Sequence, residues 1–265
     1  MTYHFDLTIP AHAYLFGFLQ ADGHLSRATR NRGKIRIELK VGDRSILEEF
    51  KRLLPVYSSV TTRERDTNFK KKYQSAIWTL CDQELREILN LLGLPYGKKS
   101  ANITLPPFPF SEADYFRGII DGDGSLGLTG KGFPFLSLTT KSRLFTLAYL
   151  DLVKRLTGKV KKAKPNTRDQ IYNICVYKED AQSLATFLYY PECLCLDRKA
   201  AQAQRVNQWI RPSNMVKVTW ERRRWTSDED AVVRALPLLV AAEQLSRTER
   251  SVRVRRSRLN QQTTL

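Results

Sequence analysis

Two stretches of the sequence, "LFGFLQADGHL" at residues 15–25 and "FRGIIDGDGSL" at residues 116–126, follow one pattern. Gly17 aligns with Gly118 and Asp22 aligns with Asp123, each pair 101 residues apart (118 − 17 and 123 − 22). Each stretch is predicted to be a helix that ends in an acid followed by glycine. A helix C-terminus carries partial negative charge and is better matched by a cation. The two aspartates therefore require an explanation other than helix stability.

The repeat extends beyond these stretches. A lysine lies 18 residues after each aligned aspartate and another lies 76 residues after it; these are Lys40, Lys141, Lys98 and Lys199. We interpret residues 8–103 and 112–211 as two copies of one unit. The proline-rich segment 104–111, "TLPPFPFS", is the expected linker between them.

Both units are predicted to have the element order helix, two strands, helix, two strands, helix. The alternation in "KIRIELKV" at residues 34–41 indicates a strand with one buried and one cationic face, paired with residues 24–30. The other elements of the first unit are a helix over 43–55, strands over 57–65 and 72–80, and a helix over 82–92. The second unit has its motif helix over 112–122 with Ser111 as N-cap, strands over 125–129, 133–140, 159–164 and 170–177, and helices over 142–156, 179–189 and 197–210.

The composition indicates a polyanionic partner. Lys and Arg total 44 against 27 Asp and Glu, which gives a formal charge of +17. Nucleic acid is favoured over a membrane, since no apolar run is long enough to span a bilayer and the first residues are not expected to form a signal peptide. The four cysteines form no C-x-x-C pair, which makes a zinc site improbable and favours reduced thiols in a cytoplasm.

Small residues recur four places after each motif glycine, as Gly17 with Ala21 and Gly118 with Gly122. Residues four apart share a helix face, so the two motif helices are expected to pack closely through these faces. Asp22 and Asp123 then meet where the helices end. Gly23 and Gly124, one residue further along, are expected to be left-handed C-caps.

Two carboxylates that meet at two negative helix ends repel each other and favour a hard divalent cation such as Mg²⁺. Beside a basic surface, such a site suits phosphodiester hydrolysis. Lys98 and Lys199 are candidates to neutralise charge on the phosphate or to position water, and Lys40 and Lys141 are candidates for the same role. A single "DGDG" is more often a turn or a helix cap, but two copies in register favour the metal site.

These residues resemble the LAGLIDADG homing endonucleases, through "LFGFLQADG" at 15–23 and "FRGIIDGDG" at 116–124. The resemblance covers residues 8–210. It implies an α+β fold of two pseudo-symmetric αββαββα repeats that form a DNA-binding saddle. It also implies a monomer that cuts both strands of a long DNA site with Mg²⁺ (or Mn²⁺) at Asp22 and Asp123, helped by the backbone of Ala21 and Gly122. Gln20, Phe16 and Arg117 depart from the usual motif.

Candidate DNA contacts lie on the predicted strands and their connections. They are Arg27, Arg30, Arg32, Lys34, Arg36, Glu38, Lys40, Arg63, Arg65, Lys72, Gln74, Ser137, Thr139, Lys141, Lys161, Arg168 and Gln170. On the strand parity of Lys141 the second unit carries Phe135, Ser137 and Thr139, which are far less charged than the first-unit face. The two halves are therefore expected to contact different sequences, and the target need not be symmetric.

The tail after about residue 212 has its own helical periodicity, and residues 220–260 resemble a Myb-like or SANT-type helix-turn-helix. "RRWTSDED" at 223–230 is similar to the start of its first helix, with Thr226 as cap, and Pro237 is a departure. "LSRTERSVRVRRSRL" at 245–259 is similar to its turn and recognition helix. The resemblance implies DNA contacts from Arg250, Arg253 and Arg256.

A site-specific, metal-dependent double-strand DNA endonuclease is therefore the leading hypothesis. The alternatives are an RNA maturase that assists splicing, with intron RNA as partner, and a non-cleaving DNA-binding regulator. Retention of both aspartates favours the enzyme. The expected compartment is the cytoplasm of a bacterium or phage host, with an organelle as the alternative.

Overall fold

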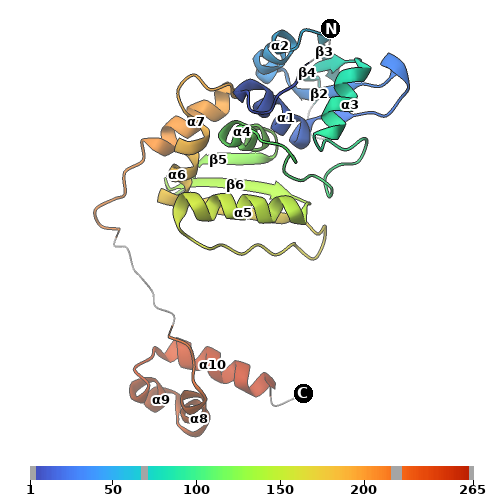
Figure 1. Ribbon diagram of the computed structural model, residues 1–265. Coiled ribbons are helices and arrows are strands. Elements are labelled where there is room, and N and C mark those ends of the chain that lie inside the picture. The colour runs from blue at the N-terminus through green and yellow to red at the C-terminus, as the bar shows by residue number, and fades with distance from the viewer. Residues whose placement is uncertain (1–3, 67–70, 216–222, 263–265) are drawn as a thin grey trace. The chain divides into compact units, whose positions relative to one another are not determined.

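The computed structural model describes residues 4–66, 71–215 and 223–262 (Figure 1). The chain divides into two compact units, Met1–Arg211 and Pro212–Leu265. Both predicted repeats and the segment between them therefore belong to one unit. In the described ranges, no helix is both long and apolar enough to cross a membrane.

The first repeat has the predicted order. Its elements are α1 (Pro10–Asp22), β1 (His24–Leu25), β2 (Ile35–Lys40), α2 (Arg44–Leu53), β3 (Ser58–Arg65), β4 (Tyr73–Leu80) and α3 (Gln83–Leu91). The strands form an antiparallel sheet in the order β1-β2-β4-β3. The β1–β2 connection is longer than a tight turn and contains a 3-10 turn at Arg30–Arg32. A second 3-10 turn, Val41–Asp43, leads into α2.

The second repeat follows the same order with one strand fewer among the described residues. Its elements are α4 (Glu112–Asp123), β5 (Gly124–Leu128), β6 (Pro134–Thr140), α5 (Arg143–Thr157), β7 (Tyr172–Tyr177), α6 (Glu179–Leu188) and α7 (Asp197–Asn207). The sheet is antiparallel in the order β5-β6-β7. Ser111 is the N-cap residue of α4, but its hydroxyl donates to Asp114 and makes no capping bond.

The predicted strand over 159–164 is wrong, because these residues form no ladder. Lys159 and Lys161 turn instead to Asp180 on α6, with Nζ–Oδ distances of 2.5 and 3.7 Å. Pro165 follows and lacks the N–H that a ladder would need. The apolar alternation that marks the other strands is also weak in this lysine-rich stretch.

One hydrophobic core joins the two repeats. The alternation in β2 buries Ile35, Ile37 and Leu39 on one face, where Phe50 of α2 and Trp78 of β4 are also buried. Figure 1 shows α1 and α4 beside each other between the two sheets. Because both helices are buried along most of their length, the paired helices fix the relative position of the two sheets.

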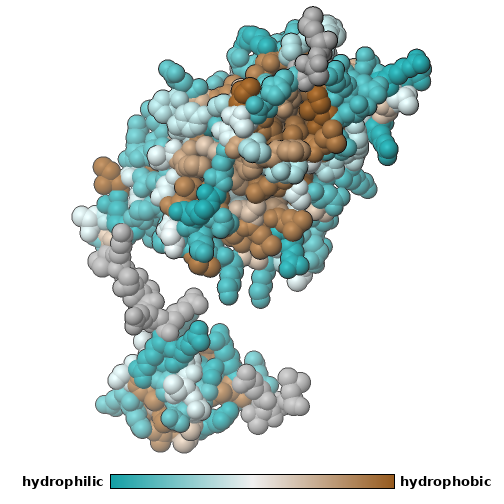
Figure 2. Space-filling model, in the orientation of Figure 1, coloured by the Kyte–Doolittle hydropathy of each residue, from teal (hydrophilic) through white to brown (hydrophobic). Residues whose placement is uncertain are grey.

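The described part of the C-terminal unit, Pro212–Leu265, contains three helices: α8 (Ser227–Ala235), α9 (Leu238–Gln244) and α10 (Glu249–Gln262). Thr226 forms the predicted cap, in a capping box with Glu229, and Pro237 precedes α9 just after α8 has ended. A small core holds the helices together: Val233, Ala241, Ala242, Leu245, Val252 and Leu259. The visible surface of this unit is mostly hydrophilic (Figure 2). The predicted start of the module at residue 220 lies outside the described residues.

Candidate active site

The helices α1 and α4 touch through their motif glycines, as predicted. A Cβ built on Gly17 would lie 2.1 Å from the backbone oxygen of Tyr115, and one on Gly118 would lie 2.2 Å from that of Tyr14. Both distances are well below van der Waals contact, so no larger residue fits at either position without moving a backbone. The glycines therefore set the separation of the two helices.

The C-terminal ends of the two helices are adjacent for the same reason. A Cβ on Gly122 would lie 2.4 Å from the Cβ of Ala21 and 3.5 Å from the backbone nitrogen of Asp22. Asp22 and Asp123 are the last residues of α1 and α4. The sequence repeat thus becomes a spatial pair of acids at one end of a tight helix seam.

The backbone conformations of Gly23 and Gly124 differ from the prediction. Their φ values are −77° and −95° in extended backbone, so neither is a left-handed cap. A Cβ at Gly23 would lie 2.7 Å from the backbone of Leu19, and one at Gly124 would lie 2.8 Å from the oxygen of Ile120. Glycine is needed here because the chain turns back closely over the helix end, not because φ is positive.

Two tyrosines cross the seam in a reciprocal pair. The Tyr14 hydroxyl on α1 donates to Asp121 Oδ2 (2.7 Å), and the Tyr115 hydroxyl on α4 donates to Gln20 Oε1 (2.5 Å). The tyrosines are 101 residues apart, as are their acceptors. Asp121 also accepts from the Tyr189 hydroxyl (2.6 Å). Gln20 and Asp121 are both buried, so this motif position serves packing and leaves the acid two residues later at the surface.

Both terminal aspartates have raised pKa values. Both reach solvent, yet protein atoms crowd their carboxyl groups along the seam. Desolvation and the neighbouring Asp22 carboxylate raise the pKa of Asp123 to about 6. Desolvation also raises the pKa of Asp22, against the opposing effect of Lys99, Lys199 and Arg198. A pair of acids with raised pKa values is the electrostatic condition that a cation relieves.

A lysine contacts the end of each motif helix. Lys99 Nζ donates to the carbonyl oxygens of Gln20 (2.8 Å) and Ala21, while Lys199 Nζ donates to those of Ile120 (2.9 Å) and Gly124 (2.5 Å). Burial lowers the pKa of Lys199 to about 8 and also lowers that of Lys99, although Asp123 and Asp22 raise the latter. Each lysine thus supplies the positive charge that a helix C-terminus favours.

The structure places Lys99, rather than the predicted Lys98, opposite Lys199. Lys98 is exposed, and no described contact joins it to either aspartate. The two lysines that contact the helix ends are 100 rather than 101 residues apart, so the second repeat is one residue shorter between its aspartate and its lysine. Spacing alone could not separate two consecutive lysines. The signal that distinguishes them is burial, which only the folded chain shows.

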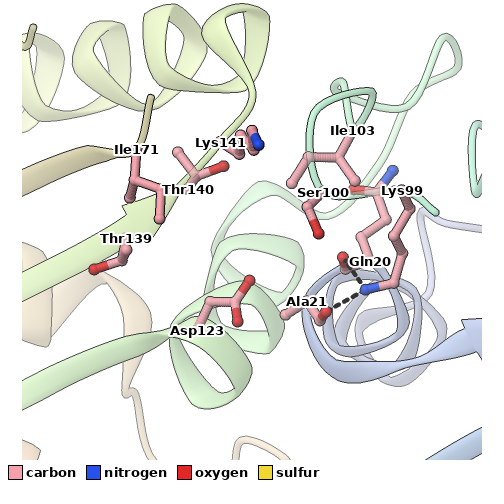
Figure 3. Close-up of a pocket in the computed structure, with 10 residues that line it drawn as sticks. All are labelled: Gln20, Ala21, Lys99, Ser100, Ile103, Asp123, Thr139, Thr140, Lys141 and Ile171. Carbon is pink, nitrogen blue, oxygen red and sulfur yellow. Dashed lines mark hydrogen bonds between the residues drawn. The ribbon is translucent and has the colours of Figure 1, made fainter. Parts of the chain in front are cut away.

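The other predicted lysines lie at the strand ends. Lys141 lines a cavity of about 260 Å³ together with Asp123, Ala21 and Lys99 (Figure 3). Lys40 is exposed, and its Nζ lies 4.0 Å from Asp43 Oδ1. The cavity therefore brings predicted residues from both repeats to one place.

Arg36, Glu38, Lys40, Arg63 and Arg65 share one face of the first sheet, as the strand register shows. Glu38 accepts from Arg36 (2.8 Å) and from the Ser75 hydroxyl (2.7 Å), and lies 3.3 Å from Arg65. Desolvation of the carboxyl group raises the pKa of Glu38, but these partners outweigh it and the pKa is lowered. The glutamate thus holds the arginines of this face in an ordered network.

The remaining predicted DNA contacts of the first repeat do not all lie on this face of the sheet. Arg27, Arg30, Arg32 and Lys34 are exposed in the β1–β2 connection. Gln74 lies on the opposite face of the sheet from Arg63, because it opposes Glu64 in the register and donates to it (3.0 Å). Lys72 lies just outside β4.

The second sheet presents a nearly uncharged face, as the sequence predicts. Ser137 and Thr139 on β6 lie opposite Cys175 and Asn173 on β7. Of the other candidates, Arg168 and Gln170 are exposed before β7, and Arg168 pairs with Asp169 (2.7 Å). Lys161 pairs with Asp180, as described above.

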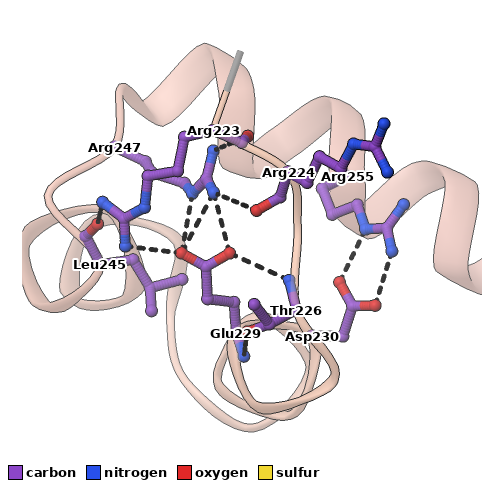
Figure 4. Close-up of polar contacts among 8 residues, drawn as sticks. All are labelled: Arg223, Arg224, Thr226, Glu229, Asp230, Leu245, Arg247 and Arg255. Atoms are coloured by element: carbon purple, nitrogen blue, oxygen red, sulfur yellow. Dashed lines mark hydrogen bonds and ion pairs between the residues drawn. The ribbon is translucent and has the colours of Figure 1, made fainter. Parts of the chain in front are cut away.

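Several arginines of the small unit make internal contacts, and Figure 4 shows those of Arg223, Arg247 and Arg255. Arg247 pairs with Glu229 (2.8 Å), and Arg255 pairs with Asp230 (2.6 Å). Arg256 Nε donates to the carbonyl of Val233 (2.9 Å), so the structure turns this predicted DNA contact inward. Arg250, Arg253 and Arg258 are exposed on α10.

The donors available to a metal are limited. Within the described ranges, no three His, Cys, Asp or Glu side chains gather closely enough to hold a metal ion. Asp22 and Asp123 offer hard carboxylate oxygens, which fit Mg²⁺ or Mn²⁺ and not a soft metal. The remaining ligands would have to be backbone oxygens, water or a substrate phosphate.

The LAGLIDADG-like domain family model matches residues 10–92 and 111–188, which are the two repeats built around α1 and α4. The chain belongs to the LAGLIDADG-like family. Both matched segments contain one motif helix and its terminal aspartate. None of the curated proteins matches this LAGLIDADG chain.

Several solved structures of homing endonucleases are similar to this chain. The homing endonuclease I-WcaI, bound to its DNA recognition sequence, has a TM-score of 0.51 at 15% identity over 73% of this chain and 87% of that protein. I-LtrWI, bound to target DNA, gives 0.46 at 10% identity over 74% and 87%. I-SmaMI, bound to uncleavable DNA, gives 0.43 at 12% identity over 66% and 81%. The similarity to I-WcaI confirms the two-repeat LAGLIDADG fold.

Proposed function

We propose that this LAGLIDADG protein is a site-specific endonuclease that hydrolyses one phosphodiester bond in each strand of duplex DNA. The observation that carries the proposal is the pair Asp22 and Asp123, at the adjacent ends of α1 and α4, with Lys99 and Lys199 contacting the same helix ends. The formal charge of +17 and the arginine-rich face of the first sheet support a DNA partner. The I-WcaI structure, which contains its DNA recognition sequence, supports the same partner.

The proposed cofactor is Mg²⁺ or Mn²⁺ at Asp22 and Asp123, with backbone oxygens of Ala21 and Gly122 as further candidates. The Ala21 oxygen already accepts from Lys99, so it has one remaining lone pair for a second partner. A bound divalent ion would stabilise negative charge on phosphate oxygens and acidify a water molecule. Asp22 and Asp123 would hold and orient this ion.

The lysines are proposed to act on the phosphate. Each Nζ donates to two backbone oxygens, which leaves one of its three protons for a further acceptor. Such a positioned cation stabilises charge that develops in the transition state, or orients a water that does so. Lys141, in the same cavity as Asp123, is a further candidate, and Lys40 is its counterpart in the first repeat.

DNA is proposed to lie across the two sheet faces, with unequal contributions from the repeats. Arginine pairs readily with guanine in the major groove, whereas Ser and Thr contact several bases. The ordered arginines Arg36 and Arg65 therefore suit the first half of the site, and Ser137 and Thr139 suit the second half. An asymmetric target follows from this difference.

The small unit is proposed to be a helix-turn-helix that adds DNA contacts through α10. The exposed residues Arg250, Arg253, Val254, Ser257 and Arg258 lie at helical spacing on one face. Because Arg256 contacts the interior of the unit, we propose Arg258 as a DNA contact in its place.

Selection of cleaved molecules from a randomised duplex library in Mg²⁺ tests the function. We expect recovery of one long, asymmetric site that is cut in both strands, with no products when EDTA replaces the metal. A protein that yields no cut site but binds intron RNA tightly would instead be a maturase. A protein that retains one duplex sequence without cutting it would be a regulator.

A further inference from the structure

The residues that precede the second helix of each repeat differ in chemistry. Ser142, before α5, accepts from the backbone nitrogen of Phe145 (3.1 Å) and so caps its helix. Asp43, before α2, makes no capping bond, although Asp is among the best N-cap residues. Its two carboxylate oxygens accept instead from Arg198 Nε, at 3.2 and 3.0 Å.

Both cap residues reach across to the other repeat. Arg198 lies in the first turn of α7, directly before Lys199. The Ser142 hydroxyl donates to the backbone oxygen of Ile103 (2.6 Å), four residues after Lys99. Each cap residue therefore anchors the segment that carries the lysine of the opposite repeat.

The two anchors are unequal in strength. The Asp43 carboxylate is buried and paired with a guanidinium, and charge-assisted bonds of this kind are about twice as strong as neutral ones. The Ser142 anchor is a neutral bond to one backbone oxygen. A second contact, from the Ser45 hydroxyl to Asp197 (3.4 Å), joins α2 and α7 beside the ion pair.

Arg198 also influences the ionisation of Asp22 and Lys199. Its charge opposes the rise in the pKa of Asp22 and contributes to the lowered pKa of Lys199, where burial is the larger cause. Asp43, Asp121 and Asp22 are the acids that act in the opposite sense on Lys199. Lys98, which precedes Lys99, has no described contact with either aspartate.

We propose that the Asp43–Arg198 ion pair is a positioning device for Lys199, and that it makes the two cleavage reactions of this enzyme unequal. The pair fixes the first turn of α7 and thereby the position of Lys199 Nζ against Ile120 and Gly124. The weaker Ser142–Ile103 hydrogen bond holds the segment that carries Lys99, and so it restricts the position of Lys99 Nζ less. This inference rests on the proposed endonuclease function.

Strand-resolved cleavage tests the inference. The selected target duplex carries a different fluorophore on each strand, and the two rate constants are measured under single-turnover conditions. Lys199→Met identifies the strand that Lys199 serves. We expect Asp43→Asn, Asp43→Ala and Arg198→Ala to slow that strand by about 10-fold or more, since small misplacements of a reacting group cost this much. Ser142→Ala should slow the other strand.

Two variants separate positioning from general destabilisation. Arg198→Lys keeps the charge with poorer geometry and should restore part of the lost rate on the affected strand. Arg205→Ala, exposed in the last turn of the same helix, should leave both rates unchanged. Thermal melting of each variant reports its stability independently of the strand ratio.

Equal slowing of both strands by the Asp43 and Arg198 variants would overturn the inference, as would no effect on either strand. Failure of Arg198→Lys to improve on Arg198→Ala would also count against it. If the wild-type chain cuts no selected duplex, the proposed function itself fails and this inference fails with it. The two failures are therefore distinguishable by the wild-type reaction.

Discussion

At the residue scale, four acidic or amide side chains near the motif ends divide into two roles. Asp121 and Gln20 are buried and fully engaged with tyrosines and backbone, whereas Asp22 and Asp123 face the solvent beside lysines. The repeat register alone selects Asp123 over Asp121, because only Asp123 aligns with an acid. The same register selects Lys98 instead of Lys99, because the spacing between the aspartate and the lysine that contacts the helix end differs by one residue between the repeats.

The raised pKa of Asp123 leads to a stability prediction in metal-free buffer. A carboxyl group whose folded pKa is about 6 binds more protons when folded than when unfolded between about pH 4 and 6. The contribution of Asp123 to wild-type stability should therefore rise as the pH falls through this window. Asp123→Asn removes the repulsion and should raise the Tm at pH 7 by roughly 2–4 °C, after allowance for solvent screening.

Calorimetry of both proteins in EDTA at several pH values measures this effect. The advantage of Asp123→Asn should be largest at pH 7 and should shrink below pH 6, where wild-type Asp123 becomes protonated. A variant less stable than wild type at pH 7 would mean that the Asp123 carboxylate is not electrostatically strained.

At the element scale, the contact between α1 and α4 is set by backbone approach. Gly118→Ala would place a methyl group against the backbone oxygen of Tyr14, and helix backbones cannot yield as a side chain can. We expect a loss of about 3 kcal/mol in the free energy of unfolding, at the upper end of overpacking effects. Gly130→Ala, at a position with no neighbouring atom within 4 Å, is the control and should change stability little. Denaturant unfolding compares the two, and equal midpoints would contradict this packing.

The crossed tyrosines give a second prediction at this scale. Tyr14→Phe removes a hydrogen bond to a buried carboxylate, and Tyr115→Phe removes one to an amide. Hydrogen bonds to charged groups contribute about 1.5–3 kcal/mol and neutral ones about 0.5–1.5 kcal/mol. Tyr14→Phe should therefore be the more destabilising of this matched pair in urea unfolding. The reverse order would show that Asp121 is held mainly by Tyr189 and Leu196.

Element positions were largely predictable because apolar periodicity decides them, as in β2 and α2. Close contacts between backbone segments were harder to predict from the sequence. Gly23 and Gly124 indicate a left-handed cap by residue type, yet the structure uses them because the chain folds back onto Leu19 and Ile120. The Asp43–Arg198 contact joins residues 155 apart in the sequence, and no local pattern indicates it.

At the scale of the whole molecule, the two repeats form one unit and the tail forms another. The tail predictions illustrate the limits of a charge pattern. Arg253 and Arg256 look equivalent in the sequence, but Arg256 donates to the carbonyl oxygens of Val233 and Leu236 at the C-terminal end of α8, while Arg253 is exposed. Which arginines are free depends on the fold of the module.

Deletion of residues 212–265 should weaken DNA binding without abolishing cleavage. Each phosphate contact contributes about −0.9 to the slope of log affinity against log salt, so the slope should become less steep by about 2–3. The triple variant Arg250→Ala, Arg253→Ala and Arg258→Ala should reproduce most of this change, with Arg234→Ala as the control. Fluorescence anisotropy with the selected duplex at several salt concentrations measures the slope. An unchanged slope would show that the small unit contributes no phosphate contacts.

The central claim is that Asp22 and Asp123 jointly hold the cation that DNA cleavage needs. The most direct measurement is cleavage of the selected duplex in Mg²⁺ by wild type, Asp22→Asn and Asp123→Asn, together with their affinities for that duplex in Ca²⁺. Each substitution should reduce the cleavage rate by at least about 10³-fold, of the order found when a group that stabilises a transition state is removed, while affinity stays within a few-fold of wild type. Substantial cleavage by either variant would contradict the claim.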